Sequence, residues 1–275
     1  MSVGSLRDVT TVEELIAFLQ AKGRNHQAYY HYTTWDSLEK IMGNSSFLLT
    51  RGNSTSINDQ HEALMKGSRR EWNRTYIGSF SFGTAENMAM WALYGLPWED
   101  AVRLEIPRAA MNEWVGSIGG VYLWGTDDEL PCEAEVQLAD IVYAHGRAQD
   151  DKLQLTHRDK TIWALPDTGL AEVDSRRAMT GYIKNYAWHY ENEVRLIIRL
   201  PHDEGVEKVK VPVPQKVLDQ VRVITGPSFQ HKGSALYRRL QQEGRLWESD
   251  FRHLVKYRPL CSLCSHEAFS RRKDV

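Results

Sequence analysis

The chain has 275 residues with a formal net charge of −2, and hydrophobic and charged residues make up 42% and 25% of it. These values are typical of a globular protein and exclude extended disorder and collagen-like structure. The near-neutral balance excludes a uniformly basic nucleic-acid-binding surface, although it leaves room for a local basic groove. A chain of this length buries a core without disulfides, so we predict a single domain over residues 1–260 with a tail over 261–275.

No window approaches the roughly 18 apolar residues that a membrane-spanning helix needs. The first residues lack the apolar run of a signal peptide, and Cys132, Cys261 and Cys264 are too few for a disulfide framework. We therefore expect a cytoplasmic protein that does not contact a membrane.

Hydrophobic spacing, caps and chain breakers predict the elements in order. In the first half we expect helices over 11–22, 34–42, 59–72 and 84–94, and strands over 28–32, 47–49 and 75–82. In the second half we expect strands over 101–106, 192–200, 206–213 and 221–225, and helices after Pro107 and over 173–187 and 232–243. Helices dominate the early part and strands the later part, which indicates the α+β class.

Two acidic residues at the start of the apolar strand over 192–200 form the most informative pattern. Glu191 and Glu193 are spaced so that strand geometry projects them to the same side. Burying two carboxylates together raises a pKa unless cations or hydrogen bonds compensate. The pair is therefore a candidate for catalysis, and the alternative is a salt-bridge cluster with Arg195 or Lys184.

Three polar and aromatic segments accompany this pair. His31–Thr33 stands where a strand meets a helix, and Ser79–Ser81 has its serines on one face of a strand. Trp91 and Tyr94 share one face of the following helix. Together they suit a flat heteroaromatic amide, whereas the alternatives are an interior histidine and ordinary packing of a strand on a helix.

In this order the segments resemble the ADP-ribosyltransferase fold, and within it a bacterial family often found beside phage-defence genes. The resemblance covers about residues 28–226, and its most specific part is the Glu-x-Glu-x-Arg element. Its motifs stand here as Tyr30–Thr33, Asn58-Asp59 with Glu62, Ser79–Ser81, Met90-Trp91 with Tyr94, and Lys184, Trp188, Tyr190, Glu191, Glu193 and Arg195. Gln60 departs from the family, which has proline there, and this puts the local turn in doubt.

The resemblance implies an α+β fold with a split, mixed or antiparallel sheet and flanking helices. It also implies NAD as cosubstrate, with transfer of ADP-ribose and release of nicotinamide. Glu193 would then be catalytic, since a carboxylate beside the ribose stabilises its developing positive charge. Glu191 would orient the acceptor or act as general base, and the two roles can be exchanged.

The same resemblance implies the residues that bind NAD. His31 would hold the adenosine ribose or the nicotinamide amide, assisted by the backbone of Tyr32 and the hydroxyl of Thr33. Arg51 is a candidate for the pyrophosphate because its fork of donors suits phosphate, although an exposed solubilising arginine is the alternative. The remaining residues would stack on nicotinamide or offer hydroxyl donors, and they are Phe80, Trp91, Tyr94, Ser79 and Ser81.

The leading hypothesis is an ADP-ribosyltransferase that acts as a toxin or phage-defence effector and modifies a nucleic acid, RNA or DNA, with protein as the second choice of acceptor. An inhibitory antitoxin protein would be a further partner. The alternatives are an NAD glycohydrolase, in which water replaces the acceptor, and a catalytically silent module that binds a ligand or partner.

Two other groups of residues are candidates for binding a ligand. Cys261, Cys264 and His266 resemble half a zinc site whose fourth ligand is not evident, and we expect no metal at the candidate site. Basic residues near Trp72 and Trp247 offer a path for single-stranded nucleic acid, or else form solvated helix faces. These residues are Arg69, Arg70, Arg74, Arg238, Arg239, Arg245, Arg252, Lys256, Arg258, Arg271, Arg272 and Lys273.

Overall fold

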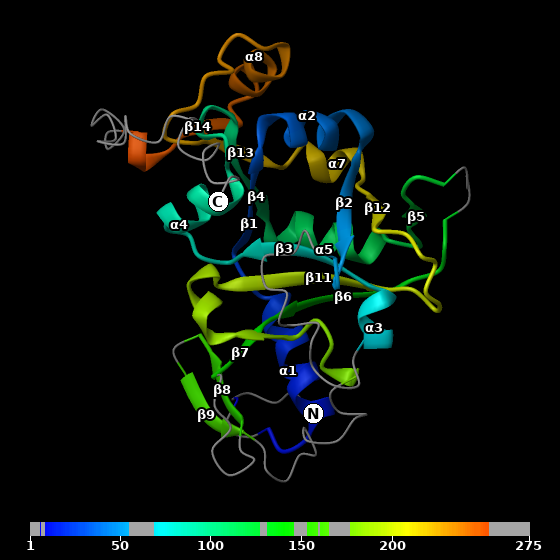
Figure 1. Ribbon diagram of the computed structural model, residues 1–275. Helices are drawn as coiled ribbons and strands as arrows, with labels where there is room; N and C mark the ends of the chain where they lie inside the picture. The colour runs from blue at the N-terminus through cyan, green and yellow to red at the C-terminus, as the bar shows by residue number, and fades with distance from the viewer. Residues whose placement is uncertain are drawn as a thin grey trace, which may run out of the picture.

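The computed structural model describes residue 6 and the ranges 9–54, 69–126, 131–145, 153–158, 160–164 and 177–252. Within them, helices flank a sheet that contains both parallel and antiparallel pairs (Figure 1). The α+β class predicted from the sequence is therefore confirmed.

The described part is organised around a ten-stranded sheet. Its strands are β1 (Ala28–Thr34), β2 (Ser46–Arg51), β3 (Thr75–Ser81), β4 (Ala101–Pro107), β5 (Tyr122–Leu123), β6 (Glu135–Asp140), β11 (Glu193–Arg199), β12 (Lys208–Pro212), β13 (Arg222–Thr225) and β14 (Leu246–Glu248). The main path runs β14-β13-β4-β1-β3-β2-β12-β5, while β11 pairs with both β3 and β6. Of these pairs, β13 with β14 is parallel and the others are antiparallel.

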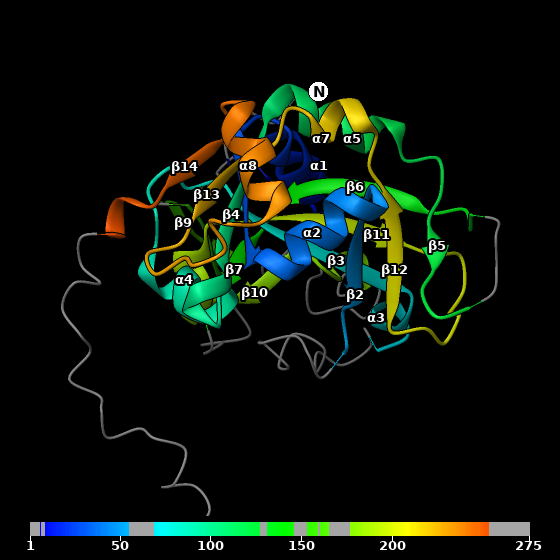
Figure 2. The ribbon, with the colours of Figure 1, turned by 90° about the horizontal axis from the view of Figure 1, so that it is seen from above.

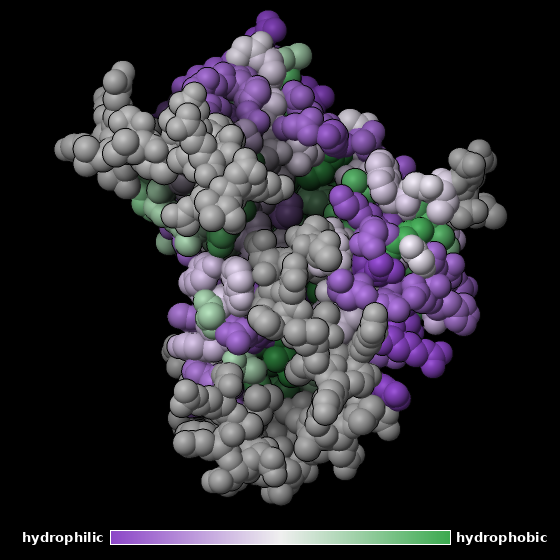
Figure 3. Space-filling model, in the orientation of Figure 1, coloured by the Kyte–Doolittle hydropathy of each residue, from purple (hydrophilic) through white to green (hydrophobic). Residues whose placement is uncertain are grey.

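The sheet forks at β3. One edge of β3 pairs with β11 from Thr75 to Ser81, while the other edge is shared by two strands. There β2 pairs opposite Tyr76 and Ile77, and β1 pairs only where Tyr30 faces Ser81. In Figure 1, β1 and β2 accordingly rise from β3 and run across the direction of β3 and β11. The molecular surface is hollowed in this region, below α2 (Trp35–Asn44), as the space-filling view shows (Figure 3).

A smaller sheet and the helices surround this fork. The smaller sheet has the order β10-β7-β8-β9 and consists of β7 (Val142–Ala144), β8 (Leu153–His157), β9 (Lys160–Ala164) and β10 (Ile183–Asn185). Besides α2, the described helices are α1 (Val12–Gly23), α3 (Arg69–Asn73), α4 (Met88–Tyr94), η3 (Trp98–Asp100), α5 (Arg108–Ser117), η4 (Tyr186–Glu191), α7 (Gln215–Leu218) and α8 (Ala235–Gln242). Figure 2 shows α2, α7 and α8 on the same side of the large sheet.

The core lies on both faces of the sheet because strand alternation sends neighbouring side chains to opposite sides. On β11, Val194, Leu196 and Ile198 belong to the largest cluster, whereas Ile197 packs with the N-terminal helix α1. A capping box in which Thr11 and Glu14 bond to each other's backbone starts that helix.

Most predicted elements are confirmed, including α1, β1, β3, β11 and α8. Of the helix predicted over 173–187, residues 177 and 178 are helical, but the prediction is wrong beyond them, because residues 179–182 form turns and Ile183–Asn185 forms β10, which pairs with β7. The helix expected from Thr84 begins instead at Met88, since the side chain of Asn87 caps it. The predicted helix over 59–72 falls largely outside the described residues, as does the tail over 261–275.

Candidate active site

Glu191 and Glu193 meet at the junction between η4 and β11. Glu191 ends η4, Glu193 begins β11, and Asn192 between them has a left-handed φ of 46°. Asparagine is among the residues that tolerate this conformation best. The two carboxylates are only 3% and 2% exposed, respectively, so the sharp turn delivers a buried acidic pair.

Lys184 joins the two carboxylates. Its Nζ lies 2.5 Å from Oε2 of Glu191 and 3.1 Å from Oε2 of Glu193. Lys184 lies on β10 and is itself only 5% exposed. A buried cation shared by two acids compensates part of the cost of burying them, and it holds both at one point.

Glu193 has further partners that keep it ionised. Ser79 donates a hydrogen bond of 2.6 Å to its Oε1, and Nε of Arg195 donates to the same atom at 2.8 Å. Burial raises the pKa of Glu193, but the charges of Arg195 and Lys184 outweigh it and bring the pKa well below the ordinary glutamate value. The carboxylate is thus both charged and fixed in orientation.

Glu191 has the opposite electrostatic setting. Burial and the neighbouring charge of Glu193 raise the pKa of Glu191, against the opposing effects of Lys184 and Tyr94. The Tyr94 hydroxyl donates a hydrogen bond of 2.6 Å to its Oε1. The surroundings thus push the pKa values of the two carboxylates in opposite directions.

His31 lies at the fork in the sheet. Its Nδ1 is 2.9 Å from the carbonyl oxygen of Ser79, beyond the single pair that joins β1 to β3. The bond requires the proton on Nδ1, so the neutral ring presents Nε2 as an acceptor. Burial lowers the pKa of His31, although its bond to Ser79 opposes that shift, and the rings of Phe47 and Phe80 pack beside the imidazole.

The predicted aromatic residues do not form one box. Phe80 is buried in the largest cluster, on the opposite face of β3 from the two serines. Trp91 is 0% exposed and packs edge-on against Tyr32. Of the three predicted stacking residues, Tyr94 is the one whose polar end reaches the acidic pair. Stacking by Phe80 and Trp91 on a ligand stays a prediction.

The other predicted binding residues are dispersed. Ser81 faces Glu193 in register and accepts a bond of 3.3 Å from the Gly83 N–H, whereas Thr33 is half-buried on the face of β1 that carries His31. Arg51 forms ion pairs with Glu207 and Asp203 at the far end of β2, so the described contacts of Arg51 are not with the acidic pair.

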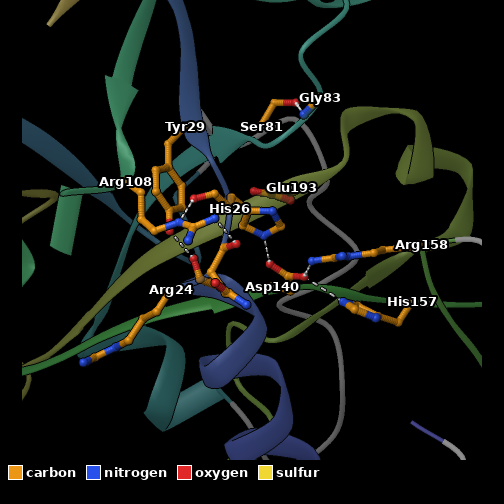
Figure 4. A network of polar contacts seen from close by, with 12 residues as sticks. Arg24, His26, Tyr29, Ser81, Gly83, Arg108, Asp140, His157, Arg158 and Glu193 are labelled. Atoms are coloured by element: carbon orange, nitrogen blue, oxygen red, sulfur yellow. Dashed lines mark hydrogen bonds and ion pairs between the residues drawn. The ribbon is translucent and has the colours of Figure 1, made fainter. Parts of the chain in front are cut away.

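A buried aspartate beside the site escaped the sequence interpretation. Asp140 lies opposite Val194 in register and is fully buried. His26 Nε2 and His157 Nε2 approach its two oxygens at 2.5 and 2.7 Å, and Arg158 donates to it at 3.0 Å (Figure 4). Burial raises the pKa of Asp140, but the bonds from the histidines prevail and lower it to about 2. No sequence motif predicts this network, because its members come from separate segments of the chain.

The basic residues around α8 are largely paired with acids. Glu243 pairs with Arg239 and Arg245, and Glu248 pairs with Lys232 and Arg252. Such neutralised clusters are weaker attractants for a phosphate backbone than free cations. The tail cations lie outside the described residues, together with Asn58, Asp59, Glu62, Cys261, Cys264 and His266.

No protein-family model matches the chain, and no curated protein matches it either. Within the described ranges, no group of three or more His, Cys, Asp or Glu residues is placed to hold a metal ion. Among the same residues, no helix has the length and apolar character that crossing a membrane requires.

Proposed function

We propose that this protein is an ADP-ribosyltransferase that uses NAD, with Glu193 and Glu191 as its catalytic residues. One observation carries the proposal: two buried carboxylates share Lys184, and their surroundings shift their pKa values in opposite directions. Adjacent acids with separated proton affinities are characteristic of sites that divide charge stabilisation from proton transfer.

Glu193 stabilises positive charge. It is ionised, buried and oriented by Ser79 and Arg195, so its charge needs no rearrangement to act. NAD, when bound, supplies a glycosidic bond to a nicotinamide leaving group, whose loss leaves positive charge on the ribose. A preorganised carboxylate is the group that such chemistry requires.

Glu191 accepts the proton of the incoming group. Its raised pKa makes it a better proton acceptor than an ordinary glutamate, as a general base for an incoming hydroxyl or amine should be. The Tyr94 hydroxyl holds the carboxylate in place.

The donor and acceptor set also fits NAD. His31 offers Nε2 as an acceptor because Nδ1 is engaged by Ser79, and both a ribose hydroxyl and a carboxamide N–H can donate to it. A nucleic acid remains our proposed acceptor on the strength of the family resemblance alone. The roles as toxin or defence effector, the antitoxin partner and the cytoplasmic location stay predictions on the same footing.

Radiolabelled NAD, incubated with separate pools of RNA, single-stranded DNA, duplex DNA and lysate protein, tests the proposal. We expect label in one pool, and at least about a hundredfold less with Glu193→Gln. Glu135→Gln, which alters an acid with a side chain 57% exposed, is the matched control and should label normally. Glu193→Gln leaves Lys184 and Arg195 without the negative charge that pairs with them, which can destabilise the fold. Glu193→Asp keeps this charge and therefore serves as a second variant.

Each alternative has its own outcome. Nicotinamide release without labelled macromolecule would identify an NAD glycohydrolase. A folded Glu193→Gln protein with full labelling would contradict the catalytic assignment. The absence of both label and nicotinamide release would favour a silent binding module, which agrees with the existing ion pairs of both carboxylates.

A further inference from the structure

A buried arginine without an acidic partner lies near the candidate active site. Arg103 on β4 is 5% exposed, and none of the described carboxylates forms an ion pair with it. Arg195, which is 2% exposed, has Glu193 as its counter-ion. Because arginine stays protonated in proteins, Arg103 is a buried charge that the described fold leaves uncompensated.

The hydrogen bonds of Arg103 are long and incomplete. One Nη donates to the Tyr32 hydroxyl at 3.3 Å, and the two Nη atoms lie 3.4 and 3.5 Å from the Thr84 carbonyl oxygen. Its Nε is buried and has no hydrogen-bond partner among the described residues. Good N–H···O bonds are about 2.7–3.2 Å long, so this guanidinium has donors left for a stronger acceptor.

The ring faces of two tyrosines also lie close to the guanidinium, and these ring contacts use none of its N–H donors. Its central carbon lies 4.4 Å from the ring centre of Tyr30 and 5.6 Å from that of Tyr32. Ring faces stabilise a cation but leave its in-plane N–H groups unused. The Tyr32 hydroxyl also accepts a bond from the Asn87 N–H, which leaves its own proton to donate.

The register places this arrangement on the face of the sheet that carries Glu193. Arg103 is opposite Tyr32, Tyr30 is opposite Ser81, and Ser81 is opposite Glu193. Strands β4 and β11 are thus separated by β1 and β3. The guanidinium lies 4.4 Å from the ring centre of Tyr30, the residue at which β1 meets β3, so one extended ligand can contact both places.

We propose that Arg103 and Tyr32 bind a phosphate group of the substrate. The assignment rests on the proposed function, for which the phosphate is part of the NAD diphosphate. A phosphate matches the fork of Nε and Nη donors, and it would replace the long bonds to Thr84 in the loop between β3 and α4. Arg103 thereby takes the role that the sequence suggested for Arg51.

Binding of inorganic pyrophosphate, measured by calorimetry, tests this site directly. We expect the wild-type protein to bind it, and Arg103→Met to raise the Kd at least about tenfold. Met fills much of the same volume and removes an unpaired buried charge, so the variant should fold. Arg238→Met is the matched control, because Arg238 is exposed on α8 and one of its Nη atoms donates to the Gly233 carbonyl.

Two milder variants keep the test decisive if Arg103→Met fails to fold. Arg103→Lys keeps the charge but loses the fork, and Tyr32→Phe removes one hydroxyl, so both should bind pyrophosphate more weakly than the wild type. Wild-type protein that does not bind pyrophosphate, or variants that bind it as the wild type does, would overturn the phosphate site.

The outcome is separable from that of the proposed function. Pyrophosphate binding that depends on Arg103, without cleavage of NAD, keeps the phosphate site and removes the transferase proposal. If Arg103→Met cleaves NAD with an unchanged KM, the transferase proposal stands and the phosphate site is excluded.

Discussion

Glu193 and Asp140 are two buried carboxylates on the adjacent strands β11 and β6, and both have lowered pKa values. Glu193 is held by the buried cations Lys184 and Arg195 and shares the lysine with a second acid. Asp140 is held chiefly by two histidines, and Arg158, which also pairs with it, is 39% exposed at the side chain.

The comparison separates two uses of a buried acid. The partners of Asp140 come from the loop after α1 and from the hairpin of β8 and β9, so the aspartate ties distant segments together. Glu193 instead lies beside Glu191, whose pKa is shifted in the opposite direction, and the Ser79 hydroxyl donates a hydrogen bond to Glu193. A lowered pKa is therefore common to both acids and does not distinguish them, whereas the diverging pKa values of Glu193 and Glu191 do.

Asp140→Asn tests this distinction with the largest expected effect on stability. Breaking a buried charge network costs about 3 kcal/mol, so we expect the free energy of unfolding in urea to fall by that amount. The labelling activity per folded molecule should stay near wild type. Asp36→Asn, at an exposed pair with Lys40, is the control and should cost less than about 1 kcal/mol. Loss of activity in fully folded Asp140→Asn would place Asp140 in the catalytic machinery.

The acid dependence of stability sharpens the comparison further. Folding lowers the pKa of Asp140 from 3.8 to about 2, so the unfolded chain binds more protons than the native protein between these values. Its contribution is complete above about pH 5 and is lost as the pH falls toward 2, to a total of roughly 2 kcal/mol. Urea unfolding at several pH values should show this loss in the wild type and a shallower loss in Asp140→Asn. Equal slopes in the two proteins would rule out this linkage.

Tyr94→Phe should have the smallest effect, and it concerns the other acid of the pair. The Tyr94 hydroxyl lowers the pKa of Glu191, so its removal should move the acidic limb of the activity profile to higher pH. We expect the plateau rate to fall by less than about tenfold. Tyr122→Phe, at a half-buried tyrosine on β5, is the control. An unchanged profile in Tyr94→Phe would show that Glu191 does not govern the reaction.

Local pattern was enough to predict the strand that carries the site. The apolar run after Glu193 and the acid spacing are visible in the sequence, and so are the candidate cations Lys184 and Arg195. The same kind of pattern failed at residues 183–185, where the helix prediction lost to pairing with β7. Short segments follow their tertiary partners more than their own propensity.

The sequence by itself determined the α+β class, the main strands and the spacing of the two acids, and it offered Arg195 or Lys184 as an alternative, structural partner for them. Only the tertiary structure decided that Ser79 reaches Glu193 across 114 positions, that Tyr94 reaches Glu191 across 97, and that Arg103 is buried with no ion pair to a described carboxylate. The physical reason is that local spacing sets the direction of a side chain on its own strand or helix. Its partners, its burial and therefore its pKa depend on which distant strands pair with that element.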